Sequence, residues 1–210
     1  MSYFFYDNIH LCKQALPQKD FDELKEYVTA DYEKFPHYNF LKKNEIPINK
    51  VEKAIVKMLG DQQHHIEYWF SRGDETEWHV DGDEVYEKNN PGKIGKTAKA
   101  SYIVFLEVEN LIGGEFECTP DIKHDSKGSF RDYRFEPPPN ARLLTIFPKE
   151  NLCVRITNGV YHRVLRTISG KRTCLAFALW SEAPEGYKKH NHWSEIEDGS
   201  LAPKYWPIKE

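Results

Sequence analysis

The sequence has few cysteines, and their spacing excludes two common uses of that residue. Only 4 of the 210 residues are cysteines, and no two of them form a CxxC motif: Cys12, Cys118, Cys153 and Cys174. Zinc knuckles and small disulfide-stapled secreted domains both need closely spaced cysteines. We therefore expect neither, and we expect reduced thiols in a cytoplasmic protein.

The sequence also lacks long apolar runs and blocks of basic residues. No stretch approaches the roughly 18 apolar residues that cross a bilayer, and the first residues, MSYFFYDNIH, lack the basic and apolar regions of a signal peptide. The formal net charge is -4, and lysine and arginine form no stripe that would follow a nucleic-acid backbone. We expect neither a membrane nor a nucleic acid as partner, and instead a small molecule or a peptide segment.

What the chain does have is enough apolar and aromatic residues, 40% and 14%, to form one core. A single domain over residues 1–210 is therefore expected. Apolar residues at helical spacing predict helices over 18–35 and 47–60, and after Gly60 the pattern changes to short strands. The fold expected is mainly β with flanking N-terminal helices (α+β). In it, 1–60 form a helical support, 61–181 the β core and 182–210 a C-terminal extension.

Three long segments without clear periodicity interrupt the β core: residues 84–97, residues 120–140 and the tail that follows Trp180. Loops of this length are usually lids, binding loops or disordered segments. We expect the first two to select the substrate.

The stretch TEWHVDGD places His79 and Asp81 two residues apart at the end of a predicted strand. Residues i and i+2 of a strand project from the same face, so both side chains can reach one point. Taken alone, such a pair is more often a surface turn. His162, at the start of HRVLRTISGKR, is the downstream histidine best placed to supply a third ligand. Two imidazoles and one carboxylate on one side of an ion form the facial arrangement of non-haem Fe(II) oxygenases.

The segment after His162 predicts a hairpin. If Ser169, Gly170 and Lys171 form a three-residue loop with Gly170 in the left-handed conformation, His162 faces Ala178 and even-numbered residues point inward. Arg172 and Cys174 would then line the cavity, with Leu175, Phe177 and Leu179 outward against the helices. A two-residue loop would turn Arg172 outward instead. A buried guanidinium beside a metal needs an anion to meet it, and we expect the carboxylate of a co-substrate.

An ordered set of residues resembles the HxD...H...R pattern of the Fe(II)- and 2-oxoglutarate-dependent dioxygenases. The stretch YIVFLEVENLIGGEFEC looks like their prolyl 4-hydroxylase-like branch, and the similarity covers roughly residues 64–181. The residues that carry it are His79, Asp81, Gly113, Gly114, Glu115, His162, Gly170 and Arg172.

The resemblance implies a double-stranded β-helix, a jelly-roll or cupin-like barrel. It implies that His79, Asp81 and His162 bind Fe(II), that 2-oxoglutarate and O2 are the co-substrates, and that ascorbate can be a further requirement. Arg172 would pair with the distal carboxylate of 2-oxoglutarate. Cys174 occupies a position where relatives often have a serine or threonine that also contacts the co-substrate.

The chain departs from its relatives at a second contact. Where they often have a co-substrate-binding tyrosine, this sequence has Phe70 and Phe105. The missing hydroxyl group must then come from elsewhere. The candidates are Tyr68, Tyr102 and Thr145.

The resemblance implies hydroxylation of an aliphatic C–H bond with release of succinate and CO2. Halogenating relatives replace the carboxylate ligand by a small residue, so Asp81 argues against halogenation. The favoured substrate is a small molecule such as a free or carrier-bound amino acid. A peptidyl (prolyl-type) hydroxylase and a non-catalytic binding or sensing module are the alternatives. The sequence leaves the substrate's identity and the oligomeric state open.

Overall fold

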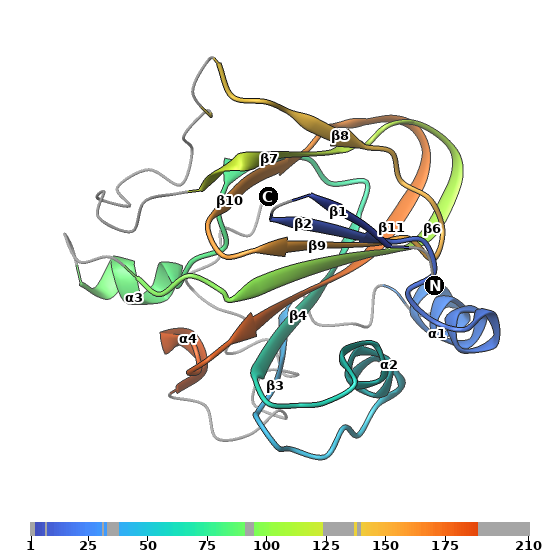
Figure 1. Ribbon diagram of the computed structural model, residues 1–210. Coiled ribbons are helices and arrows are strands. Elements are labelled where there is room, and N and C mark those ends of the chain that lie inside the picture. The colour runs from blue at the N-terminus through green and yellow to red at the C-terminus, as the bar shows by residue number, and fades with distance from the viewer. Residues whose placement is uncertain are drawn as a thin grey trace.

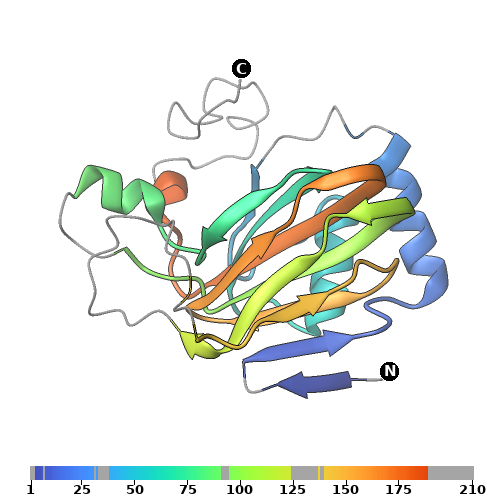
Figure 2. The same cartoon turned by 90° about the horizontal axis from the view of Figure 1, so that it is seen from above.

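The computed structural model describes residues 3–6, 8–30, 32, 38–90, 95–123, 137 and 140–188. Eleven strands in this part of the chain form two antiparallel sheets that face each other, with α1 and α2 beside the larger sheet (Figure 1). The short helices α3 and α4 lie together at one end of the sheets (Figure 2). The described helices include none long and apolar enough to cross a membrane.

The larger sheet has seven strands in the order β1-β2-β9-β6-β11-β4-β3, and the smaller has four in the order β5-β10-β7-β8. The strands of the larger sheet are β1 (Tyr3–Tyr6), β2 (Ile9–Cys12), β3 (Tyr38–Leu41), β4 (His65–Arg72), β6 (Ala100–Gly113), β9 (Cys153–Thr157) and β11 (Thr167–Trp180). Those of the smaller sheet are β5 (Thr76–His79), β7 (Phe116–Lys123), β8 (Leu144–Ile146) and β10 (Val160–Val164). The chain passes between the sheets several times, which is the jelly-roll arrangement and confirms the predicted fold class.

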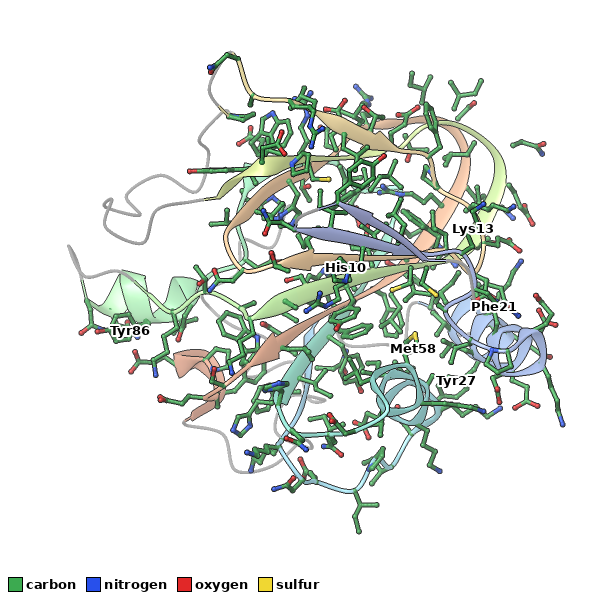
Figure 3. All side chains as sticks on the ribbon, in the orientation of Figure 1. His10, Lys13, Phe21, Tyr27, Met58 and Tyr86 are labelled. Atoms are coloured by element: carbon green, nitrogen blue, oxygen red, sulfur yellow. The ribbon has the colours of Figure 1, made fainter. Side chains whose placement is uncertain are left out.

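Both predicted N-terminal helices are present; the second is shorter than expected, and residues 31 and 33–35 of the first prediction lie outside the described residues. Helix α1 covers Gln18–Ala30 and α2 covers Lys50–Leu59. Asn49 and Glu52 form a capping box at the start of α2, and Gly60 ends it with φ +78°. Phe21 of α1, with Tyr27 and Met58 close by, lies at the helix-facing side of the larger sheet (Figure 3).

Strand β11 divides the core into two parts because its side chains alternate between the two faces of the larger sheet. Leu175, Phe177 and Leu179 pack under the helices in one apolar cluster. Cys174 belongs to a second cluster between the two sheets, together with Phe105 and Phe116. The face of the larger sheet that looks toward the smaller sheet is called the inner face below.

The predicted hairpin is wrong, although the facing of Arg172 is right. Strand β10 pairs with β5 and β7 in the smaller sheet, whereas β11 pairs with β4 and β6 in the larger one, so His162 does not face Ala178. Gly170 has the expected positive φ of +83°, but it lies in an irregularity within β11. A Cβ atom there would lie 2.3 Å from the carbonyl oxygen of Asn110. Arg172 still points inward, because alternation along a strand does not depend on which strand is its partner.

Several elements were not predicted. Strands β1 and β2 extend the larger sheet beyond β9, and β3 pairs with β4 at its other edge. A short helix, α3 (Glu84–Asn89), occupies part of the loop expected over residues 84–97, and α4 (Glu185–Lys188) follows β11. Residues 124–136 of the second loop and 189–210 of the tail lie outside the described residues.

Candidate metal centre and its two flanking sites

The structure brings the three predicted metal ligands together on the smaller sheet. His79 is the last residue of β5, and its register partner on β10 is His162. The Nε2 atom of His79 lies 3.9 Å from one oxygen of Asp81, and the Nε2 atom of His162 lies 3.7 Å from the other. One donor atom from each of the three residues falls within 4.8 Å of the other two. Two distant segments of the chain therefore converge on one point.

The backbone sets which nitrogen of each imidazole faces this point. Nδ1 of His79 lies 2.7 Å from the carbonyl oxygen of Glu77, and Nδ1 of His162 lies 3.0 Å from that of Val160. A carbonyl oxygen only accepts hydrogen bonds, so Nδ1 carries the proton in both neutral rings. The lone pair is then on Nε2, the atom that faces Asp81. Such contacts orient metal-binding histidines in proteins.

His162 is kept neutral by its surroundings. It is only 5% exposed, and burial lowers its pKa, with the neighbouring His79 lowering the pKa further and Asp81 opposing them. The two rings are close, with centroids 4.2 Å apart. A neutral imidazole is the form that binds a metal ion.

The donor set fits a small divalent metal ion. Nitrogen and carboxylate ligands bind such ions at about 2.0–2.2 Å, which places neighbouring donors about 3 Å apart in an octahedral shell. The observed separations of 3.7 and 3.9 Å are slightly wider, so a small inward movement of side chains suffices. Two imidazoles and one carboxylate also match the 2-His-1-carboxylate triad in ligand type.

Arg172 is the largest fully buried side chain of the described residues, with 1% exposure. Its Nη1 donates to the carbonyl oxygen of Gly114 at 3.0 Å, and its Nη2 donates to that of Asp74. Its own carbonyl oxygen accepts from the amide of Gly73 at 3.0 Å. These contacts hold Arg172 where β4 crosses to β5 and β6 crosses to β7. The region around them, together with Arg166 and Thr167, is called the corner end.

The corner end has buried polar groups without a hydrogen-bond partner among the described residues. Arg172 Nε and the hydroxyl oxygen of Thr167 are buried, and neither has a hydrogen-bond partner within the described part of the chain. Both side chains lie beside Gly114, where a Cβ atom would come within 3.0 Å of Thr167 Oγ1 and 3.5 Å of Arg172 Cδ. Leaving such donors unpaired is costly. An anion that accepts from the guanidinium and the hydroxyl would remove that cost, so the residues here fit a carboxylate group.

Cys174 lies next to this region, opposite Ser71 of β4 and Phe105 of β6. Burial raises the pKa of its thiol to about 12, so the neutral thiol is the form present. Ser71 carries the hydroxyl group opposite Cys174, and no motif in the sequence singles it out.

The three hydroxyl groups proposed from the sequence lie elsewhere, and that expectation is wrong. Tyr68 donates to Glu52 on the helix side of the sheet, and Tyr102 accepts from Arg155 there. Thr145 is exposed and bonds to Glu117. Thr167 and Ser71 are the hydroxyl groups that the fold brings to the inner face instead.

Glu67 is a second residue that the sequence did not single out. It lies on β4 opposite Ala178 of β11, which puts it on the inner face, six residues of extended strand or about 20 Å from Arg172. Its carboxylate accepts a hydrogen bond from Trp180 Nε1 at 3.1 Å. Burial raises its pKa to about 8, with further raising by Asp81 and then Asp83, while hydrogen bonds from Trp180 and Tyr187 oppose this. The region of Glu67, Trp180 and α4 is called the helix end below.

Asp83 joins the two short helices at the helix end. One carboxylate oxygen accepts from the amide of Tyr86 in α3 at 3.0 Å, and the other accepts from the amide of Glu185 in α4 at 2.9 Å. Tyr86 lies in α3, far from α1 (Figure 3). The two helices thus depend on one aspartate two residues after Asp81.

No protein-family model matches the sequence, and a comparison with curated proteins finds no match. Solved structures do match. A Pseudomonas putida prolyl-4-hydroxylase is similar with a TM-score of 0.52 and 12% identity, over 84% of this chain and 94% of the other. The non-haem α-ketoglutarate-dependent epimerase SnoN from nogalamycin biosynthesis has a TM-score of 0.52 and 10% identity, over 82% and 79%. SnoN in complex with Fe3+, α-ketoglutarate and nogalamycin RO is similar with a TM-score of 0.50. The chain therefore has the double-stranded β-helix fold that these two proteins share.

Proposed function

We propose that the protein is an Fe(II)- and 2-oxoglutarate-dependent dioxygenase that hydroxylates an aliphatic C–H bond of a small molecule, such as a free or carrier-bound amino acid. The observation that carries the proposal is the convergence of His79, Asp81 and His162 in a fold whose inner face also holds Arg172 with an unsatisfied donor. The similarity to SnoN, whose complex contains Fe3+ and α-ketoglutarate, supports the same ligands here.

Each residue has a defined task in this proposal. His79, Asp81 and His162 would hold the iron, and the backbone carbonyls of Glu77 and Val160 keep the two Nε2 atoms pointed at it. Arg172 would bind the distal carboxylate of 2-oxoglutarate. When bound, iron and 2-oxoglutarate supply the oxidising chemistry, in which O2 is consumed, succinate and CO2 are released and a C–H bond of the substrate is hydroxylated. The apolar cluster around Phe105 and Phe116 lies beside His162 and would keep water from the iron site.

Thr167 extends the contact made by Arg172. Its buried hydroxyl can donate to the same carboxylate group, because Gly114 lets both side chains approach one place. The neutral thiol of Cys174 can donate only a weak hydrogen bond and otherwise contributes packing.

A peptidyl hydroxylase is the second candidate, favoured by the fold similarity to a prolyl-4-hydroxylase. Turnover on free amino acids compared with turnover on proline-containing peptides separates the two. A non-catalytic module on the same fold is the third, and the intact set of His79, Asp81, His162 and Arg172 argues against it.

The test is succinate formation by the purified chain with Fe(II), 2-oxoglutarate, ascorbate and air. Slow succinate release without substrate, abolished in Asp81→Ala, supports the proposal. Iron binding is measured separately by anaerobic titration, so that a chain that binds iron without forming succinate is recognised as a binding module. Iron binding that survives Asp81→Ala and His162→Ala unchanged would contradict the proposed site.

A further inference from the structure

Glu67 occupies an unusual position for an acidic residue. It lies in the middle of β4, with register partners on both sides, Ala178 on β11 and Phe40 on β3. It is 7% exposed and faces inward, in the same direction as Trp69 two residues later. Acidic residues are almost never fully buried unless they are paired.

The side chains that hydrogen-bond to Glu67 are aromatic. Trp180 Nε1 and the side chain of Tyr187 hydrogen-bond to its carboxyl group. The ring of Tyr187 stacks on Phe40 with centroids 4.4 Å apart, and Trp69 packs near Trp180. Aromatic rings around a carboxylate suit a cation, because ring faces attract positive charge.

The charged groups that act on the pKa of Glu67 are acidic, and the basic group beside it on the same face is His65, which stacks on Phe40. Asp81 and Asp83 are close enough to raise its pKa, and no described lysine or arginine forms an ion pair with it. Three carboxyl groups from β4 and from the segment after β5 thus share the helix end. A cation from outside the protein would be stabilised there by charge and would remove the cost of burying the carboxylate.

Small side chains connect Glu67 with the candidate metal centre. The amide of Ala98 donates to the carbonyl oxygen of Asp81 at 3.1 Å, and its side chain packs with Ala178, the register partner of Glu67. Ser101 of β6 lies opposite Ala178 on the other side. A ligand held at Glu67 therefore lies beside small residues that lead toward Asp81.

We infer that Glu67 binds a positively charged nitrogen of the substrate, so that the substrate of the proposed dioxygenase is a basic amino acid or amine, free or within a peptide. The part of this inference that concerns the reaction rests on the proposed function. The binding of a cation at Glu67 does not depend on it. Glu67 acts as a specificity-determining residue and the aromatic side chains around it shield the ion pair from water.

The binding test uses isothermal titration calorimetry of the full chain with Fe(II) and 2-oxoglutarate under anaerobic conditions. The probes are L-lysine and L-arginine, each compared with a neutral analogue of similar shape, L-norleucine and L-citrulline. We expect at least one cationic probe to bind ten-fold or more tightly than its analogue. N-acetyl-L-lysine methylamide, which mimics a peptide, distinguishes a free amino acid from a peptide segment. The inference is overturned if L-lysine binds no more tightly than L-norleucine and L-arginine no more tightly than L-citrulline, and if N-acetyl-L-lysine methylamide also gains no affinity from its charge.

Variants and proton release sharpen the test. Glu67→Gln keeps the shape of the side chain and should remove the ten-fold preference. Glu107→Gln is the control, because Glu107 is also buried but bonds to Thr173 on the opposite face, and it should leave the preference unchanged. Because the raised pKa of Glu67 keeps it largely protonated at pH 7, cation binding should release a proton, measured in buffers of different ionisation enthalpy. A preference that persists in Glu67→Gln contradicts the assignment.

The same probes keep this inference separate from the proposed function. Charge-selective binding without succinate formation supports the role of Glu67 and rejects the dioxygenase. Succinate formation with no charge selectivity in binding rejects the role of Glu67 and leaves the dioxygenase in place.

Discussion

The two ends of the inner face of the larger sheet differ in their ionisable side chains and in what satisfies their buried polar groups. At the corner end, Arg172 is held by backbone carbonyls of two strand crossings and still has an unsatisfied Nε. At the helix end, Glu67 is hydrogen-bonded by Trp180 and Tyr187 and faces two further carboxylates. One end is prepared for an anion and the other for a cation. Arg172 on β11 and Glu67 on the neighbouring strand β4 therefore place a cationic and an acidic side chain at opposite ends of one sheet face.

The origin of the difference is local. The corner end is made of backbone groups at glycine-rich crossings, which offer carbonyl oxygens and close approach. The helix end is made of aromatic side chains and short helices tied together by Asp83. Substitutions can therefore affect one end and not the other.

The largest effect is expected at the candidate metal centre, because the proposed reaction takes place there. Asp81→Ala should lower succinate formation by more than 100-fold, because it removes a ligand that other residues cannot replace. Unfolding of the metal-free protein should change little. Asp121→Ala, a surface substitution, is the control. A large loss of stability with residual activity would show that Asp81 has a structural role instead.

Arg172→Met should raise the KM for 2-oxoglutarate by roughly 30- to 100-fold with a smaller change in kcat, as expected for loss of a charge-assisted contact worth about 2–3 kcal/mol. Steady-state kinetics at saturating metal measure it. Arg155→Met removes an arginine that bonds to Tyr102 on the other side of the sheet and should leave KM unchanged. Similar KM values in both variants would place the dicarboxylate elsewhere.

Gly114→Ala tests the close approach at the corner end. Its φ of +74° and the 3.0 Å contact of an added Cβ with Thr167 Oγ1 both oppose a side chain. We expect about ten-fold weaker binding of 2-oxoglutarate and about 1–2 kcal/mol of lost stability. Gly60→Ala has a similar φ of +78° but nothing within 4 Å, so it should lose stability without losing affinity.

Thr167→Val removes one unsatisfied hydroxyl group and keeps the shape of the side chain. The KM for 2-oxoglutarate should rise about three- to ten-fold, while stability without ligand stays equal or increases. Thr119→Val removes a buried hydroxyl that bonds to the carbonyl of Tyr161 and should do the reverse, lowering stability with KM unchanged. Loss of stability in Thr167→Val would indicate a protein partner for the hydroxyl.

The smallest effect concerns the helix end and pH. The folded-state pKa of Glu67 is about 8, above the ordinary value of 4.5, so its protonation stabilises the fold fully below pH 4.5 and this contribution is lost as pH rises through 8. The Tm of the wild type relative to Glu67→Gln should therefore fall by several degrees between pH 5 and pH 8. Thermal melts at four pH values measure this, and a constant difference would mean that Glu67 is ionised throughout.

Alternation along strands allowed the sequence to predict the directions of side chains. The inward direction of Arg172 follows from it and holds in the structure, and His79 and Asp81 do meet at one point, although Asp81 lies just beyond the end of β5. Strand pairing depends on contacts between distant segments, so the predicted hairpin between β10 and β11 failed, and the strands before α1 were missed. Thr167 and Ser71 could not be found, because Thr167 is placed by the crossing at Gly114 and Ser71 by the pairing of β4 with β11. Glu67 had a signal, an acidic residue inside the apolar stretch HIEYWF, that indicated a buried carboxyl group without showing its neighbours.

The carbonyl groups that accept hydrogen bonds from Arg172 belong to the segments in which the chain passes from one sheet to the other. Loss of that guanidinium would therefore loosen the junctions themselves as well as the hold on a dicarboxylic acid. A variant that had lost oxidation could lose the iron ligands with little change in its architecture, but loss of the arginine would require replacement contacts at both strand crossings.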